Sequence, residues 1–456
     1  MTDLARSLTA KAWNALGGEA GAMDALSFAG EGALPSAFAV TDLAGASVAA
    51  AALAVAQLVA DGGCAMPAVS IDRRLASFWF GLSLRPVGWS LPALWDPIAG
   101  DYRGADGWIR LHTNAPHHRA AAQSVLGPHG DKAAMAAAVA GWRVGELEAA
   151  VVAAGGCAAQ MRGVEAWTSH PQGAAVAGEP LVHIVPTDRA VGRPVWSPSP
   201  SRPLAGLRVL DLTRILAGPV GSRFLAGYGA DVLRIDPPGW DEPGVIPEVA
   251  LGKRCARLDL KDPADRATFE GLLAQADVMI HGYRPQALEG LGYGAAARRA
   301  LSPSLVDVSL CAYGWTGPWA GRRGFDSLVQ MSAGIADAGM AWKGAAVPTP
   351  LPVQALDFAT GYLMAAAAVR GLSARLKTGL GGQTRLSLAR TAKFLVDAGR
   401  GDDAPFAPET EADLGEGLEA TDWGPARRVR APHVVEGAPA AWALPARKLG
   451  WAEAAW

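Results

Sequence analysis

Cysteine is scarce in this chain. Four of its 456 residues are cysteines, and they lie far apart without any CxxC pair. This spacing argues against both a disulfide framework and a structural zinc site. We therefore expect no bound metal, and free thiols in a reducing cytosol, at Cys64, Cys157, Cys255 and Cys311.

The chain also lacks a strong charge of either sign. Its formal net charge is -2, which excludes bulk electrostatic attraction to nucleic acid or to an acidic membrane, so local groups must meet any anionic ligand. Residues 1–6 lack a basic region followed by an apolar core, as a secretory signal would have. The most apolar stretch, Val48–Ala60, has about thirteen residues, whereas a membrane span needs roughly 20. The sequence predicts a cytoplasmic protein with no nucleic-acid or membrane partner.

The length of the chain predicts several domains, because one hydrophobic core usually serves no more than roughly 250–300 residues. Residues 1–88 predict helices with a short strand at Val69–Ile71. Residues 89–160 predict a small α+β unit, since a hairpin signal with an Asp-Gly turn lies at Asp101–Leu111. Residues 161–203 predict a return segment and a linker rich in proline and serine.

Residues 204–398 have the pattern of an α/β domain. Short apolar strands alternate with helical segments, which predicts right-handed crossovers and a parallel sheet covered on both faces. The expected strands are Leu207–Leu212, Asp231–Asp236, Val278–His281 and Leu305–Ser309. The predicted fold class is therefore α/β, a Rossmann-like parallel sheet with a small α+β domain. Residues 399–456 are acidic and rich in proline and glycine, and we expect them to form an extended tail.

The first strand-turn-helix of this domain lacks a dinucleotide fingerprint. Leu216–Gly221 does not have the GxGxxG spacing that lets a pyrophosphate approach the backbone, which argues against NAD binding. The helix that follows still presents free amides at its N-terminus. Such amides suit an anionic ligand.

Asp357 is the strongest candidate for chemistry. It opens an alanine-rich segment and Gly361 follows four residues later, so little bulk surrounds a carboxylate that could act as a nucleophile. The alternative is a simple helix N-cap. Asp42 opens a similar segment, and a strand-like piece follows each Asp after about thirty residues, so the chain contains part of one module twice. For Asp42 a capping role is favoured, because its glycine, Gly45, follows after three residues and not after four.

Motifs in residues 203–396 resemble, in order, those of the family III CoA-transferases, also called the CaiB/BaiF family. Residues 35–80 resemble a second copy of the Asp-helix-strand piece, and residues 95–160 resemble the family's small domain. The resemblance implies the CoA-transferase family III fold with a partial N-terminal duplication. The motifs are Pro203–Thr213 with Ala217–Pro219, Gly229–Gly239, Gly252–Arg254 with Leu258–Lys261, Ala276–Pro285, Gly314–Trp319, Gly324–Asp326 with Gln330, and the segment around Asp357.

The resemblance implies that CoA moves from an acyl-CoA donor to a carboxylic acid. In this scheme Asp357 attacks the thioester, which gives a mixed anhydride and CoA thiolate, and the thiolate then forms an aspartyl-CoA thioester from which an acceptor carboxylate takes CoA. No cofactor is expected to be bound permanently, because CoA and acyl-CoA are substrates. The sequence does not identify the donor or the acceptor.

Seven positions match CoA contacts of that family. Lys253 and Arg323 would pair with CoA phosphates through charge-assisted bonds. The chain departs from the family at Gly282, where an Asn is common, and at Gly290, where a basic residue is common, so CoA affinity or pose would change. The matching positions are Ile215, Ala217, Arg234, Lys253, Gly282, Tyr283 and Arg323.

Two alternatives to transfer remain. An α-methylacyl-CoA racemase uses a His together with the corresponding Asp, but no His lies between Gly314 and Asp357. A non-catalytic CoA-binding paralogue is the other alternative. Of the remaining histidines, His117 and His118 are expected to be solvated loop residues, and His281 is expected to line the CoA site.

Family resemblance also bears on assembly, since members are typically interlocked homodimers. The N-terminal copy could supply within one chain what a partner normally supplies. A homodimer or a single-chain pseudo-dimer is therefore implied, with residues 1–180 packed against the 203–396 core of the same or a partner chain. No glycine-rich loop that would shield an acyl intermediate is evident between Gly81 and Trp95, which disfavours formyl- and oxalyl-type substrates.

Overall fold

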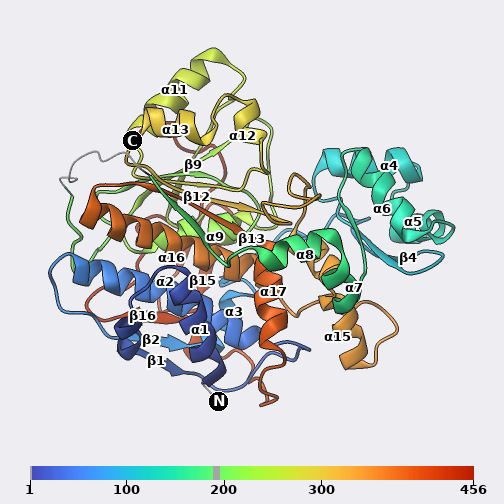
Figure 1. Cartoon of the computed structure of the whole chain (residues 1–456), viewed down its shortest axis with the longest axis horizontal. Helices are drawn as coiled ribbons and strands as arrows, with labels where there is room; N and C mark the ends of the chain where they lie inside the picture. Colours follow the sequence, from blue (N-terminus) through green and yellow to red (C-terminus); the bar gives the residue numbers. More distant parts are fainter. Residues whose placement is uncertain (1–2, 188–195) are drawn as a thin grey trace.

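A seven-stranded sheet forms the centre of the molecule (Figure 1). The computed structural model describes residues 3–187 and 196–456, so part of the predicted linker, residues 188–195, lies outside the described residues. All neighbouring strands are parallel except the edge strand β7, which runs antiparallel to β13. The predicted Rossmann-like α/β sheet is confirmed. In spatial order the strands are β10 (Lys253–Arg257), β9 (Asp231–Asp236), β8 (Arg208–Leu212), β11 (Val278–His281), β12 (Val306–Cys311), β13 (Gly382–Ser387) and β7 (His183–Pro186).

Helices cover both faces of this sheet, as buried parallel strands require. One face carries α11 (Pro263–Ala274), α12 (Ala287–Gly290) and α13 (Ala295–Leu301). The other face carries α9 (Ala217–Gly227) and α16 (Ala355–Thr378), which share one hydrophobic core with the sheet. These two helices place the predicted site loop and Asp357 on the same side of the sheet.

A second buried helix, α2 (Val40–Asp61), packs against α16. Its length and composition would allow it to cross a membrane, but 94% of its most apolar 18-residue window is buried inside the protein. The apolar stretch predicted from sequence was too short, because the helix begins well before Val48. In this structure α2 is a core helix.

The N-terminal part builds a small sheet beneath α2. The strand expected at Val69–Ile71 is present as β2 (Val69–Asp72) and pairs in parallel with β1 (Leu26–Ala29). Helix α1 (Asp3–Ala15) packs on α2, and α3 (Arg73–Trp79) directly follows β2.

The joint between β2 and α3 repeats the joint between β13 and α17 (Leu388–Ala398). Asp72 caps α3 by accepting from the Leu75 N–H, and Ser387 caps α17 by accepting from the Arg390 N–H. Each cap follows a long buried helix that has an Asp in its first turn, α2 or α16. These shared features support the predicted partial duplication, which stays a prediction.

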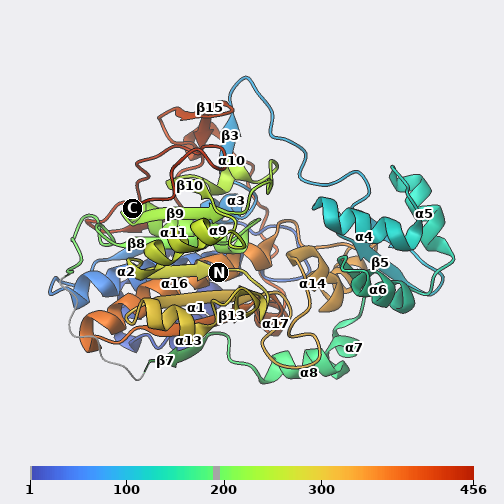
Figure 2. The ribbon, with the colours of Figure 1, turned by 90° about the horizontal axis from the view of Figure 1, so that it is seen from above.

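The small α+β unit projects from one side of the molecule, and Figures 1 and 2 agree on this placement. The predicted hairpin is confirmed, since β4 (Gly100–Arg103) pairs antiparallel with β5 (Trp108–Leu111). Strand β6 (Ala158–Gln160) completes the sheet. The unit has a hydrophobic core of its own. Its helices are α4 (Pro116–Leu126), α5 (Lys132–Ala140) and α6 (Val144–Ala153).

The C-terminal segment is integrated into the fold and is not a free surface arm. Its β15 (Gly424–Arg428) pairs with β14 (Glu419–Thr421) and with β3 (Leu84–Pro86), and β16 (His433–Val435) pairs with β2. The division of the chain into five units stays a prediction. The remaining elements are the 3₁₀ helices Ala20–Ala25 and Glu411–Asp413, α7 (Val164–Ser169), α8 (Pro171–Gly178), α10 (Ile246–Val249), α14 (Asp326–Ser332) and α15 (Ile335–Lys343).

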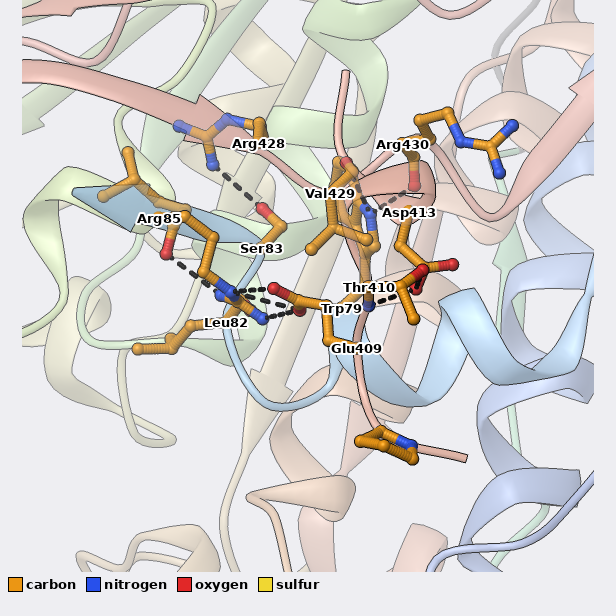
Figure 3. Close-up of polar contacts among 12 residues, drawn as sticks. Trp79, Leu82, Ser83, Arg85, Glu409, Thr410, Asp413, Arg428, Val429 and Arg430 are labelled. Carbon is orange, nitrogen blue, oxygen red and sulfur yellow. Dashed lines mark hydrogen bonds and ion pairs between the residues drawn. The ribbon is translucent and has the colours of Figure 1, made fainter. Parts of the chain in front are cut away.

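Polar contacts fasten the C-terminal segment to the N-terminal part (Figure 3). The indole N–H of Trp79 donates to the carbonyl of Arg430 at 2.9 Å, and Arg428 donates to the hydroxyl of Ser83 at 2.9 Å. Glu248, fully buried on α10, accepts from the Ser83 N–H at 2.9 Å and the Ser83 hydroxyl at 2.8 Å, and it forms ion pairs with Arg428 and Arg223. One carboxylate thus joins three parts of the chain.

Candidate functional site

A cavity of about 360 Å³ lies at the carboxyl ends of the central strands. Its walls include the turns after β8 and β11, residues 213–218 and 282–284. The sheet order continues from β8 to β9 and β10 on one side and from β11 to β12 on the other. This is the topological switch point of the sheet, where open α/β folds bind ligands. Helix α4 of the small unit contributes the facing wall through His117 and His118.

Six of the eight predicted site residues lie on the wall of this cavity. They come from separate stretches of the core domain and meet only in the folded structure. Arg234 and Lys253 do not line the cavity, and both side chains are fully buried. The six lining residues are Ile215, Ala217, Gly282, Tyr283, Arg323 and Asp357.

Lys253 lies behind the first loop. Its ammonium is 3.0 Å from Oδ2 of Asp211 and donates to the carbonyl of Pro219 at 2.8 Å. Asp211 in turn accepts from the Thr213 N–H at 2.8 Å, at the point where the chain leaves β8. The contact with a CoA phosphate expected of Lys253 is therefore not available in this structure. Lys253 instead neutralises the carboxylate that holds the start of the loop.

Arg234 has a similar supporting place. It forms ion pairs with Asp236 and Glu242, and Glu242 accepts from the Ile215 N–H at 2.8 Å and from the indole of Trp240 at 3.1 Å. Ile215 has φ of 65°, a left-handed conformation that a β-branched residue rarely adopts. Arg234 fixes the carboxylate that holds this strained backbone, and it does not reach the cavity itself.

Asp357 presents its carboxylate to the cavity from the first turn of α16. The N-cap of that helix is Gln354, so Asp357 is not the N-cap that the alternative interpretation required. Its backbone N–H donates to Oδ2 of Asp326 at 2.9 Å, and Asp326 also accepts from the amide of Gln330. The side chain is 8% exposed. This is a buried carboxylate with an opening on one side.

Burial raises the pKa of Asp357 well above its usual value, and the nearby charge of Asp326 raises it further. Burial also raises the pKa of Asp326 to about 6, although hydrogen bonds from the Asp357 N–H and from Gln330 favour its charged form. Only Asp326 has these two donors, so we assign the negative charge of the pair to it first. Asp357 is then a basic carboxylate and, once ionised, a good nucleophile.

The Asp326→Asn substitution tests this coupling. It removes the charge that raises the pKa of Asp357, so that pKa falls and the reactive carboxylate forms at lower pH. A water-soluble carbodiimide modifies the protonated carboxyl group, so we expect the fall of Asp357 modification with rising pH to occur at a lower pH in the variant than in the wild type. Peptide mass spectrometry at a series of pH values measures this shift. An unchanged profile would show that Asp326 does not control the ionisation of Asp357.

Several polar groups on the cavity wall were not predicted from the sequence. Arg214 lies over the rings of Trp240 and Tyr283, at 4.7 and 5.3 Å from their centroids, and Arg284 lies beside Tyr283 on the same wall. Each arginine is adjacent in sequence to a predicted CoA contact, Arg214 to Ile215 and Arg284 to Tyr283, a position that could have identified them. With the exposed Arg323 they are three of the four arginines that line the cavity, and the fourth, Arg322, pairs with Glu148.

Predictions for two histidine sites were wrong. His117 and His118 are not loop residues, because both lie in the first turns of α4 and line the cavity, and of the two only His117 is exposed to solvent. His281 was expected to line the CoA site, but it is buried and does not line the cavity. Its Nε2 lies 3.4 Å from Oδ1 of Asp307.

Asp42 occupies a closed environment. One oxygen of its carboxylate is 2.7 Å from Arg73, and both side chains are 2% exposed. Burial raises the pKa of Asp42, and the Arg73 charge opposes that effect. Gly401 of the C-terminal segment lies against the other oxygen, where a Cβ would come within 2.9 Å. In α17 the position that matches Arg73, 31 residues after Asp357, is Leu388, which lines the cavity.

We expect Arg73→Leu to lower the free energy of unfolding by about 3 kcal/mol at neutral pH, because it leaves the buried Asp42 without its partner. Activity per folded molecule should not change. The double variant Asp42→Leu/Arg73→Leu is the control, since replacing both charges with apolar groups should recover most of the loss. Urea unfolding measures these differences. Equal destabilisation of both variants would contradict the pairing.

Part of this chain is similar to known proteins. The family model described as CoA-transferase family III matches residues 204–427. These residues belong to CoA-transferase family III. Residues outside this match include all of the small unit and the N-terminal module.

Family III relatives match only part of this chain. The succinyl-CoA:glutarate CoA-transferase of Mus musculus is 32% identical over 211 residues, which are 42% of this chain and 48% of the relative. The acetyl-CoA:oxalate CoA-transferase of Acetobacter aceti is 33% identical over 202 residues, 41% of this chain and 51% of the relative. This chain therefore spans about half the length of these relatives. A solved CaiB/BaiF family protein from Brucella suis is 25% identical, with a TM-score of 0.39 over 49% of this chain and 65% of that one.

Proposed function

We propose that this protein transfers CoA between carboxylic acids, with Asp357 as the nucleophile. The observation that carries this proposal is the position of Asp357, whose carboxylate opens onto a cationic cavity at the switch point of a family III domain. The predicted aspartyl chemistry needs such a carboxylate beside an acyl-CoA site. The names of the relatives support CoA transfer between carboxylic acids as the class of reaction.

The reaction proceeds through two aspartyl intermediates. A carboxylate oxygen of Asp357 attacks the thioester carbon, the C–O bond forms, the C–S bond breaks, and CoA leaves as a thiolate. The thiolate attacks the Asp357 carbonyl of the anhydride, which releases the donor acid and leaves an aspartyl-CoA thioester. The acceptor carboxylate then attacks the aspartyl-CoA thioester, which gives an anhydride between Asp357 and the acceptor and releases CoA thiolate. The thiolate attacks the acceptor carbonyl of this anhydride, which forms the new acyl-CoA and restores the Asp357 carboxylate. No net proton is taken up, and each step exchanges one activated acyl group for another.

The walls of the cavity fit the rest of an acyl-CoA. Arg214, Arg284 and Arg323 offer guanidinium groups for its phosphates, which arginine binds through paired charge-assisted bonds. Trp240 and Tyr283 offer aromatic faces for the adenine. Of the residues predicted to touch CoA, Arg234 and Lys253 act in this proposal by holding the loop that carries Ile215 and Ala217.

The decisive experiment traps the intermediates. The protein is incubated with succinyl-CoA or acetyl-CoA, quenched with hydroxylamine and digested, and the peptide that contains Asp357 is analysed by mass spectrometry. A hydroxamate on Asp357, together with CoA transfer to glutarate or oxalate, supports the proposal. The Asp42→Asn variant is the matched control and should give the same adduct. CoA binding without adduct or turnover would instead support a non-catalytic CoA-binding protein.

One observation favours a second candidate, α-proton exchange of the racemase type. His118 shares the cavity with Asp357, so a histidine and a carboxyl group are both available although no His lies between Gly314 and Asp357 in the sequence. Burial lowers the pKa of His118 to about 4, which makes it a weak base and leaves transfer the favoured function. If deuterium from D₂O is incorporated at the α-carbon of 2-methylacyl-CoA and no CoA transfer is detected, α-proton exchange becomes the favoured function.

We further propose that one chain forms a complete site as a pseudo-dimer. In this structure the small unit closes the cavity of its own core domain through α4. A monomeric, active full-length protein in analytical ultracentrifugation would support this arrangement, whereas activity confined to a dimer would contradict it. The cytoplasmic location, the lack of nucleic-acid and membrane partners and the lack of a permanent cofactor stay predictions.

A further inference from the structure

His118 has an unusual environment for a polar side chain. It is 4% exposed, and both of its ring nitrogens lack a hydrogen-bond partner among residues 3–187 and 196–456. Buried polar groups in folded proteins are nearly always hydrogen-bonded, because an unpaired one costs the free energy of its desolvation. A ligand in the cavity could supply the missing partner.

The missing partner alone does not define a site. His433 is also 4% exposed, and neither of its ring nitrogens has a partner in the described part of the chain. His433 packs against Phe224 and Tyr228 in the core and borders no part of the cavity. What distinguishes His118 is its place on the cavity wall, where a bound molecule can reach it.

Contacts place His118 near Asp357 within the cavity. Its ring meets Phe325 edge to face, with 5.7 Å between the ring centroids. Phe325 directly precedes Asp326, which accepts the backbone N–H of Asp357 at 2.9 Å. The adjacent His117 is exposed, and partial burial, followed by the charges of Arg323 and Arg214, lowers its pKa. Thus Phe325 and Asp326 connect His118 to Asp357 along the cavity wall, and Arg323 lies near both histidines.

Phe325 is itself held firmly by the small unit. The ring of His112 stacks on it with 3.7 Å between centroids and an interplanar angle of 13°. His112 is buried, and its backbone N–H donates to the carbonyl of Cys157 at 2.9 Å. The small unit therefore fixes the ring against which His118 rests. A group held in this way can recognise a ligand atom without first being ordered.

We propose that His118 is an acyl-recognition residue, which donates a ring N–H to the carbonyl oxygen of the acyl group that Asp357 attacks. The ligand class is a carbonyl oxygen of a thioester or of an acyl anhydride. This inference rests on the proposed function and adds to it a residue from outside the segment matched by the family. His118 keeps its proton throughout, so no step in the transfer requires it to act as an acid or a base.

The protonation state suits this role. Burial, together with the nearby charges of His117 and Arg323, lowers the pKa of His118 to about 4, so the ring is neutral near pH 7. A neutral imidazole carries one N–H donor. It can therefore bind a carbonyl oxygen without the strong attraction that a cation would have for the free acid released in each half-reaction.

Binding measurements in the Asp357→Asn background test the proposal, because the bound acyl-CoA is not consumed there. Acetyl-CoA and CoA are titrated against Asp357→Asn alone and against the same protein with His118→Phe, His118→Gln or His433→Phe. Phe retains the ring that packs against Phe325 but removes the donor. We expect His118→Phe to weaken acetyl-CoA binding about three- to tenfold while leaving CoA binding unchanged. His118→Gln, which restores a donor, should recover part of the loss.

The controls separate the possible outcomes. His433→Phe removes an equally buried and unpartnered imidazole, and it should change neither affinity. If His118→Phe weakens acetyl-CoA and CoA equally, or changes neither, the proposed contact with the carbonyl oxygen is wrong although CoA still binds. If neither ligand binds to the wild-type protein or to Asp357→Asn, the proposed function itself fails, and this inference fails with it.

Discussion

Asp357→Asn is expected to lower the rate of CoA transfer by at least about 10³-fold, because an amide cannot form the anhydride on which every later step depends. The change conserves size, and the backbone N–H that donates to Asp326 remains. Initial rates with succinyl-CoA and glutarate, or with acetyl-CoA and oxalate, measure the loss. A variant that retains a tenth of the wild-type rate would exclude Asp357 as the nucleophile.

The same variant should be at least as stable as the wild type. Because the folded protein raises the pKa of Asp357 above its value in the unfolded chain, ionising this group costs free energy of folding as the pH rises above the unfolded value. The neutral amide of the Asp357→Asn variant carries no such cost at neutral pH. Loss of activity with an unchanged or raised melting temperature would thus distinguish a lost nucleophile from a damaged fold.

Asp42→Asn is the matched control for both measurements. Asp42 also lies in the first turn of a long buried helix that is rich in alanine. Unlike Asp357, however, it is paired with Arg73 and closed off by Gly401. We expect Asp42→Asn to retain the wild-type rate and to lose stability, the reverse of the result for Asp357→Asn.

The sheet was predicted correctly from the sequence, and six of the eight candidate site residues line one cavity. Apolar strands such as Asp231–Asp236 are short, regular and separated by helices, so local pattern identifies them and the switch point follows from their order. Asp357 and the loop at Ile215 could be assigned because they lie in motifs next to that point. These predictions depended on residues close to one another in the sequence.

The errors concern side-chain direction and long-range contact. Arg234 and Lys253 lie in strands, where successive side chains point to opposite faces, and a motif does not tell which face meets the ligand. His118 reaches the cavity from a separate unit, far from Asp357 in the sequence. The C-terminal strand β16 has no clear periodicity, and it forms by pairing with β2. Only the folded chain brings these groups together.

The Glu248→Gln substitution is expected to lower the free energy of unfolding at neutral pH by about 3–5 kcal/mol. It leaves the fully buried Arg223 without a counter-charge, and breaking a buried ion pair at one side typically costs that much. The loss should separate β3 from β15 first, because Ser83 and Arg428 both meet at Glu248. Urea unfolding, with proteolysis of the 83–94 connection as a local probe, measures both effects.

A matched control lies in the same interface. Arg85 and Glu409 form an ion pair between the same two segments, but their side chains are 33% and 24% exposed (Figure 3). Because exposed pairs contribute little, Glu409→Gln should cost less than about 1 kcal/mol. Equal losses from the two substitutions would show that burial of the charge at Glu248 does not determine the strength of this joint.

The effect of Glu248 should also depend on pH in a defined direction. Although burial opposes ionisation, Arg223, Arg428 and Ser83 lower its pKa from 4.5 to about 2 in the folded protein. A carboxyl group with a lowered pKa stabilises the fold above its unfolded pKa, and this contribution of roughly 3 kcal/mol is lost as the pH falls from about 4.5 to about 2. The difference between wild type and Glu248→Gln should therefore be full at pH 7 and smaller at pH 3. A constant difference would mean that shape, and not charge, accounts for the loss, and the three parts of the chain would then be joined by packing alone.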